Sequence, residues 1–167
     1  MYLILTSSKD SYITNKIIEN KFRATDANVG KAGTIDIFKL YEESTFLSGS
    51  TRITGSIREN STGLIKFDFE KLNALTSSNL DINSSRFSAK LKMYDILGGQ
   101  ATPSNYSLVT YPLSMSFDEG IGSDVTSFSD LDVCNYITAS YSSGSPVLWH
   151  MSGANSHGYL GSSNIDY

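Results

Sequence analysis

Apolar and polar residues alternate one by one along several stretches of this 167-residue chain. The clearest stretch is Arg86–Asp95, and Leu64–Phe69 repeats the pattern. The apolar positions of the first stretch are Phe87, Ala89, Leu91 and Met93. A period of two places successive side chains on opposite faces of a β-strand, whereas an amphipathic helix repeats every 3.6 residues. Both stretches are therefore predicted to be half-buried strands.

Shorter or less regular versions of this pattern predict five further strands: Tyr2–Leu5, Ser11–Thr14, Thr34–Tyr41, Tyr106–Phe117 and Cys134–Tyr141. The pattern changes phase within Thr34–Tyr41, as a β-bulge or burial on both faces would require. Pro112 cannot donate to a ladder, so Tyr106–Phe117 is expected at an edge or with a bend. Helical turns are expected only at Phe69–Leu75 and Asp130–Tyr136.

Turn-forming clusters such as Ser48–Ser50 and Ser142–Pro146 separate these short segments. No long helical segment is available for the crossovers of a parallel sheet. We therefore predict an all-β fold, an antiparallel β-sandwich of jelly-roll type, with one or two short helical turns. The sandwich is expected in residues 1–141. Residues 142–167, rich in Ser and Gly, are expected to form an irregular segment that packs on the sandwich or on a neighbouring chain.

Charge is sparse and unevenly distributed. The net charge is −4, all thirteen Lys and Arg residues lie at or before Lys92, and Met93–Tyr167 carries seven acids and no base. The acidic half is either a face that meets a basic partner or a chance result of the low charge content. Because the chain is acidic and has no basic stripe, nucleic acid is not an expected partner.

A membrane is not an expected partner either. No apolar run approaches the roughly 18 residues that cross a bilayer. Tyr2–Leu5, directly after Met1, lacks the basic flank and the long apolar region of a signal peptide.

Residues with catalytic potential are few. Cys134 is the single cysteine, which excludes an internal disulfide and a cysteine-rich zinc site. His150 and His157 have no third ligand at a suitable spacing. The chain contains neither a Gly-x-Ser-x-Gly turn nor a phosphate-binding or dinucleotide-binding loop. We therefore expect no catalytic residues, no cofactor and no enzymatic activity.

One acidic loop contains the calcium candidates. Asp118, Glu119 and Asp124 lie around two glycines within seven consecutive residues. Calcium takes several oxygen ligands from loops of this kind, but the spacing here does not match an EF-hand. A solvated loop or the rim of an interface is therefore the favoured interpretation, and no metal is expected.

Four aromatic residues are candidates for surface contacts: Tyr106, Tyr111, Tyr141 and Trp149. Large amphipathic rings anchor protein interfaces and also stack on sugars. Core packing is the alternative interpretation for each of them.

Three groups of residues, in order, resemble a known β-sandwich module. They are Asp10–Ile13 with Asn28–Gly30, Gly63–Phe69 with Phe87–Leu91, and Phe117–Gly120. Together they resemble the DNRLRE-type module, whose skeleton reads D-x-Y-I, N-x-G, L-x-K-F-D and A-x-L. More specifically, the chain resembles a family of virion structural proteins from tailed bacteriophages, especially contractile-tailed phages of marine cyanobacteria.

The resemblance implies a jelly-roll-like sandwich that forms part of a virus particle and has no catalytic residues. Modules of this type normally end in an arginine-bearing strand, whereas nothing basic follows Lys92 here. The resemblance therefore implies that a closing strand is absent or lies beyond Tyr167.

We accordingly expect a non-enzymatic structural protein located in the virion. Its expected positions are a head decoration, a neck or collar element, or the base of a tail fibre. Its expected partners are other virion proteins and further copies of itself. The alternative is a carbohydrate-binding adhesion module that recognises host-surface polysaccharide.

Overall fold

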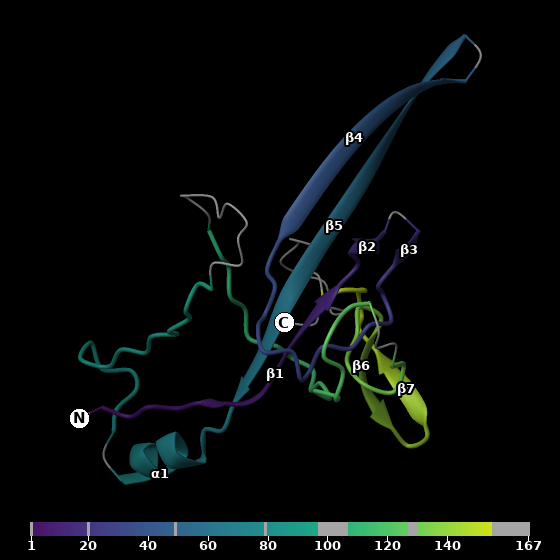
Figure 1. Cartoon of the computed structure of the whole chain (residues 1–167). Coiled ribbons are helices and arrows are strands. Elements are labelled where there is room, and N and C mark those ends of the chain that lie inside the picture. Colours follow the sequence, from purple (N-terminus) through teal and green to yellow (C-terminus); the bar gives the residue numbers. More distant parts are fainter. Residues whose placement is uncertain are drawn as a thin grey trace. The chain divides into compact units, whose positions relative to one another are not determined.

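A computed structural model of the chain describes residues 2–19, 21–48, 50–78, 80–96, 107–126 and 130–154. Its elements are β1 (Ser7–Thr14), β2 (Ile17–Ile18), β3 (Phe22–Arg23), β4 (Lys39–Ser48), β5 (Thr51–Phe67), α1 (Glu70–Ser78), β6 (Thr138–Ser142) and β7 (Ser145–Leu148) (Figure 1). Every described element except α1 is a strand, and the paired strands run antiparallel. The all-β prediction is therefore confirmed.

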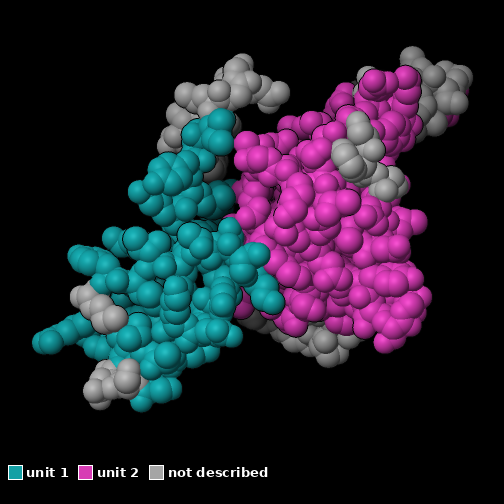
Figure 2. Space-filling view, turned by 60° about the horizontal axis from the view of Figure 1, so that its bottom comes forward, with its two compact units in different colours: residues 1–8, 66–110 teal, residues 9–65, 111–167 magenta. Residues whose placement is uncertain are grey.

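The chain divides into two compact units, which Figure 2 shows in different colours. Unit 1 contains residues 1–8 and 66–110, and unit 2 contains residues 9–65 and 111–167. Hairpin β6–β7 runs across residue 141, where the sequence analysis places a domain boundary. Because residues 155–167 lie outside the described part, the irregular C-terminal segment stays a prediction.

A three-stranded sheet has the strand order β1-β5-β4. β4 pairs with β5 in one continuous register that begins with Lys39 opposite Asn60 and includes all 10 residues of β4. The Ser8 hydroxyl donates to the Lys66 carbonyl (3.2 Å), and the Thr14 hydroxyl donates to the Asn60 carbonyl (2.8 Å). β1 therefore runs antiparallel to β5, which leaves β4 at an edge of the sheet.

Two short hairpins, β2–β3 and β6–β7, complete the described strand pairing. In the second, Ser142 lies opposite Ser145. The two residues between them, Ser143 and Gly144, have φ values of 54° and 82°. Positive φ at both central positions matches the right-handed twist of the strands that such a turn joins. The turn predicted from the cluster Ser142–Pro146 is confirmed.

The main core lies in unit 2 and joins residues from distant parts of the sequence. Its buried members are Ile13, Leu64, Phe117, Cys134, Ala139 and Trp149. A smaller cluster contains Ile18, Ala24 and Ala27. In the main cluster, side chains from β1, β5 and β6 pack together with Phe117, which lies in an irregular segment.

The most regular alternation, Arg86–Asp95, does not form a strand, so this prediction is wrong. Residues 86–95 have no regular structure, and the side chains of Leu91, Met93 and Tyr94 are 50%, 45% and 76% exposed. A strand needs a neighbour to accept and donate its ladder hydrogen bonds, and no described strand pairs with this segment. Tyr2–Leu5, also irregular, is a second wrong prediction.

Three predicted strands are only partly right. In Thr34–Tyr41 regular pairing begins only at Lys39, after the change of phase between Ile37 and Phe38, so the β4–β5 register does not test the bulge that is one of two explanations for it. In Cys134–Tyr141 the strand begins at Thr138. Tyr106–Phe117 contains no strand in its described residues 107–117, although Phe117 lies in the core.

Of the two predicted helical turns, one forms. Helix α1 confirms Phe69–Leu75, and the Asp68 carboxylate caps it by accepting the Glu70 N–H (2.9 Å). Asp130–Tyr136 is a series of bends, so that prediction is wrong. The Asn135 side chain bonds to backbone groups on both sides of its own position, and these bonds compete with a helix.

Candidate functional site

The side chain of Asn28 clamps the acidic loop onto the core of unit 2. Asn28 is fully buried. Its Nδ2 donates to the carbonyls of Glu119 (2.8 Å) and Cys134 (2.9 Å), and its Oδ1 accepts the Gly122 N–H (2.7 Å). One amide thus joins its own segment to two others, whose bonded residues lie 91 to 106 residues further along the sequence.

Glycines make this close approach possible. A Cβ at Gly30 would overlap the carbonyl of Glu119, and one at Gly122 would overlap the carbonyl of Asn28. Gly120 has a φ of 77°, a conformation that side-chain-bearing residues rarely adopt. The Lys31 N–H donates to the Gly122 carbonyl (2.7 Å), so that the two backbones are bonded at their point of contact.

A second buried amide, Asn135, holds hairpin β6–β7. Its Oδ1 accepts the N–H groups of Ile137 (2.8 Å) and Thr138 (2.7 Å), where β6 begins. Its backbone carbonyl accepts the indole N–H of Trp149 (2.8 Å), just after β7 ends. The ring of Trp149 is therefore fixed by a hydrogen bond as well as by packing.

Each carboxylate of the acidic loop has a different partner within the chain. Asp118 accepts the N–H of Tyr141 (3.0 Å) and lies 3.7 Å from the Lys9 ammonium. Glu119 accepts the N–H of Asp10 (3.1 Å) and lies 3.4 Å from the Lys31 ammonium. These contacts connect the loop to β1, to β6 and to the segment that follows Asn28.

The third calcium candidate, Asp124, accepts both the N–H and the hydroxyl of Thr126, at 2.8 and 2.7 Å. This is a local turn. Among residues that the structure describes, no three His, Cys, Asp or Glu side chains converge as metal ligands. The carboxylates of Asp118 and Glu119 therefore connect distant segments of the chain, and that of Asp124 stabilises a local turn.

The aromatic candidates have different environments. Tyr111 and Tyr141 are 57% and 42% exposed and therefore lie at the surface. Trp149 is only 5% exposed, and its ring is therefore a core side chain instead of a contact or stacking platform. Tyr106 lies outside the described residues, as does His157.

Burial also determines the chemistry of the single thiol. Desolvation by burial raises the pKa of Cys134 from 9.0 to about 11. A thiol is a nucleophile only as the thiolate, so Cys134 is unreactive at neutral pH. Desolvation and the neighbouring Asp36 carboxylate raise the pKa of Tyr12 in the same way, to about 12.

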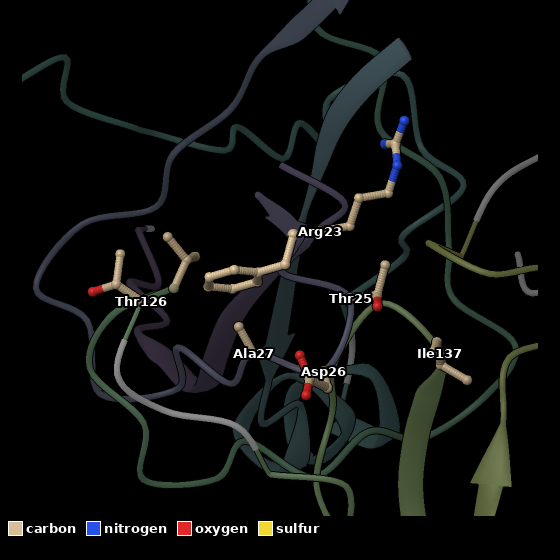
Figure 3. A pocket seen from close by; sticks show the side chains of 8 residues that line it. Arg23, Thr25, Asp26, Ala27, Thr126 and Ile137 are labelled. Carbon is tan, nitrogen blue, oxygen red and sulfur yellow. The ribbon is translucent and has the colours of Figure 1, made fainter. Parts of the chain in front are cut away.

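The sequence analysis missed a hollow in unit 2 of about 580 Å³. Its lining residues are Phe22, Arg23, Thr25, Asp26, Ala27, Val125, Thr126 and Ile137. Figure 3 shows Thr25 and Asp26 beside it, whereas the Arg23 side chain extends away and its guanidinium donates to the carbonyls of Asn15 (3.1 Å) and Arg58 (3.2 Å). The hollow combines one aromatic ring with hydroxyl and carboxylate groups.

The sequence analysis also missed the extent of the β4–β5 ribbon. The N-terminal half of β4 is exposed on both faces, with Leu40 at 54% and Tyr41 at 57%. The Arg58 guanidinium lies 5.8 Å from the centre of the Tyr41 ring, and the phenol lies 3.3 Å from the Glu43 carboxylate. Figure 1 shows β4 and β5 continuing side by side. No signal for this length exists in the period-two pattern, because Thr51–Ser61 is mostly polar.

Within the described residues, no helix has the length and apolar character needed to cross a membrane. Comparisons with known proteins found no family model, no curated protein and no solved structure that matches this chain.

Proposed function

We propose that this chain is a non-enzymatic structural protein of a tailed bacteriophage virion, built on an antiparallel β-sandwich of jelly-roll type. Its task is to hold subunits together in the particle. The observation that carries this proposal is the β4–β5 ribbon, whose strand β4 exposes both of its faces in residues 39–43. A two-stranded ribbon is only marginally stable in water by itself, so a ribbon of this length is suited to packing against another chain.

The exposed apolar residues of unit 1 support the same role. Ile82, Leu91 and Met93 are about half exposed, and Ile96 and Val109 are 66% and 69% exposed. Exposed apolar side chains gain free energy when a partner covers them. A polar, weakly charged subunit with several such surfaces is suited to an assembly, in which repeated contacts add avidity to modest individual interfaces.

The well-bonded core of unit 2 is compatible with this task. Buried Asn28 and Asn135 and the carboxylates of Asp118 and Glu119 connect distant segments of the chain. Polar groups used in this way give a rigid body on which exposed surfaces keep a fixed geometry. The proposed positions are a head decoration, a neck or collar element, or the base of a tail fibre, with other virion proteins and further copies as partners.

Mass spectrometry of gradient-purified particles of the encoding phage tests this proposal. We expect the chain to be present at a constant ratio to the major capsid protein across independent preparations. A chain found in the lysate but absent from purified particles would overturn the proposal. The double variant Leu91→Ser, Met93→Ser should lower incorporation of the chain into the particles. Its matched control, Lys71→Ser on α1, should not.

The hollow in unit 2 favours a second candidate, a carbohydrate-binding adhesion module. The exposed Phe22 ring, which lines the hollow together with Thr25 and Asp26, offers the combination of stacking and hydrogen bonding that sugars need. A glycan array of host-surface polysaccharides tests this candidate, with Phe22→Ala as the disabling variant and Phe69→Ala, at an equally exposed phenylalanine outside the hollow, as the control. An array without signal for the wild-type chain removes this candidate.

A further inference from the structure

The free edge of β4 has the features of a self-association surface. β4 is the last strand in the order β1-β5-β4, and no described strand pairs with its outer side. Its first residues carry both signs of charge, with Lys39 preceding Glu42 and Glu43. An edge of this kind presents unpaired N–H and C=O groups to any chain that can match them.

The hydrogen bonds of the sheet determine which residues of β4 direct their backbone N–H and C=O groups away from β5, toward the free edge. We call these the outward residues. The Ser61 N–H donates to the carbonyl of Phe38 (3.0 Å), so Phe38 and every second residue after it face β5. In agreement, Asn60, which lies opposite Lys39, bonds away from β4 by accepting the Asn15 N–H (3.3 Å). The outward residues of the described half are then Lys39, Tyr41 and Glu43.

We propose that β4 pairs antiparallel with β4 of a second copy of this chain, about a two-fold axis through Tyr41. Lys39 of each copy then lies opposite Glu43 of the other, and the two Tyr41 residues face each other. This inference rests on the homo-oligomeric part of the proposed function, which it deepens by naming the edge, the partner and the register.

The phase of the hydrogen bonds excludes every register whose two-fold axis lies between two residues. A two-fold axis between two residues would place an outward residue opposite an inward one, so the axis must pass through a residue. Axes through Glu42 or Glu43 place two carboxylates directly opposite each other, which is destabilising. An axis through Leu40 overlaps only the first three strand residues, and one through Ser44 brings no opposite charges together.

The register about Tyr41 also uses the charges that already lie on one face of the ribbon. Tyr41 contacts both Arg58 and Glu43 on that face. Lys39 of the second copy adds a cation beside each Glu43, whose carboxylate accepts the Tyr41 hydroxyl within its own chain (3.3 Å). Opposite charges placed directly across antiparallel strands stabilise the pairing.

Sedimentation velocity of the full chain over a range of concentrations tests the proposal by charge reversal. We expect a monomer–dimer equilibrium whose Kd rises at least about tenfold in Glu43→Lys and likewise in Lys39→Glu. Each of these changes places like charges opposite each other at two symmetry-related positions of the dimer. The double variant Lys39→Glu, Glu43→Lys restores opposite pairs and should recover most of the wild-type affinity. Glu42→Lys, which makes the same charge change opposite Leu40, is the matched control and should leave Kd within about threefold.

A cysteine pair tests the register directly, since the buried native Cys134 does not compete. Cα atoms of residues that face each other across an antiparallel hydrogen-bonded pair lie about 5.5 Å apart, within the range that a disulfide spans. Tyr41→Cys should therefore form a covalent dimer under mild oxidation, and Glu42→Cys should form much less.

A chain that is monomeric at its highest soluble concentration overturns the inference. So does a dimer that responds neither to Glu43→Lys nor to Tyr41→Cys, because it would use another surface. Neither result removes the chain from the virion, and absence from purified particles would leave a β4-paired dimer intact. The failure of this inference and the failure of the proposed function are thus distinguishable.

Discussion

In unit 2, Ile13 and Cys134 are completely buried beside Trp149, whereas in unit 1 the side chains of Leu91 and Met93 are about half exposed. Both regions contain apolar residues at alternating positions. Unit 2 differs because buried amides bond segments from opposite ends of the chain, as Asn28 does with Glu119 and Cys134. Burial of an apolar face therefore depends on whether distant segments are bonded to it, and not on alternation alone.

The largest expected effect comes from removing the amide of Asn28. In Asn28→Ala the carbonyls of Glu119 and Cys134 and the N–H of Gly122 lose a buried partner, so we expect a loss of about 3 to 5 kcal/mol in the free energy of unfolding. Urea unfolding followed by the fluorescence of Trp149, the only tryptophan, measures it. The exposed Asn73→Ala in unit 1 is the control, and a loss below about 1 kcal/mol in Asn28→Ala would contradict the comparison.

The second effect concerns the close approach of the two backbones. Gly30→Ala places a methyl group against the carbonyl of Glu119, so we expect a loss of about 2 to 3 kcal/mol. At Gly33 an added Cβ meets nothing within 4 Å, so Gly33→Ala should change the free energy of unfolding by less than about 1 kcal/mol. Equal losses in the two variants would show that the clamp does not require this contact.

The third effect is a dependence on pH. The pKa of Cys134 rises from 9.0 to about 11 on folding, so in this window the unfolded chain binds fewer protons than the folded chain. The free energy of unfolding therefore falls as the pH rises from 9 to 11, by roughly 2 kcal/mol for this group. Urea unfolding of the wild type and of Cys134→Ala at both ends of the window measures the difference. Tyr12 contributes equally to the pH dependence of both proteins. If the free energy of unfolding falls equally steeply with pH in the two proteins, the assignment to the Cys134 thiol is refuted.

The smallest effect is expected in unit 1. Because Leu91 and Met93 are about half exposed, Leu91→Ser and Met93→Ser should each change the free energy of unfolding of the isolated chain by less than about 0.5 kcal/mol. Hydrogen exchange of residues 86–96 should be fast in the isolated chain and slow in assembled particles. Slow exchange in the isolated chain would show that the segment is already packed, and the contrast with unit 2 would disappear.

Several elements of the fold could be predicted from sequence because their causes are local. Helix α1 begins where Asp68 caps it, and the turn at Ser143–Gly144 follows from residues that tolerate positive φ. The length of the β4–β5 ribbon could not be predicted, because Thr51–Ser61 is mostly polar and shows no regular alternation of apolar residues.

The candidate site was predictable only in part. Asn28–Gly30 and Phe117–Gly120 stand out in the sequence as parts of a resemblance, but nothing in it indicates that they bond to each other. For the acidic loop, the sequence favours a solvated loop or an interface rim, with calcium as the weaker alternative. In the structure two of its carboxylates instead bind backbone N–H groups and lysines. Trp149 suggests a surface platform, whereas its indole N–H is bonded inside the core.

By itself the sequence determined that the chain is built from strands, where one helix and one tight turn form, and that charge is scarce. Only the tertiary structure decided which alternating segments become strands and which residues the amide of Asn28 joins. The physical reason is that strand hydrogen bonds and buried polar bonds are made between residues far apart in the chain. Arg86–Asp95, with the most regular pattern and no paired strand, is the clearest example.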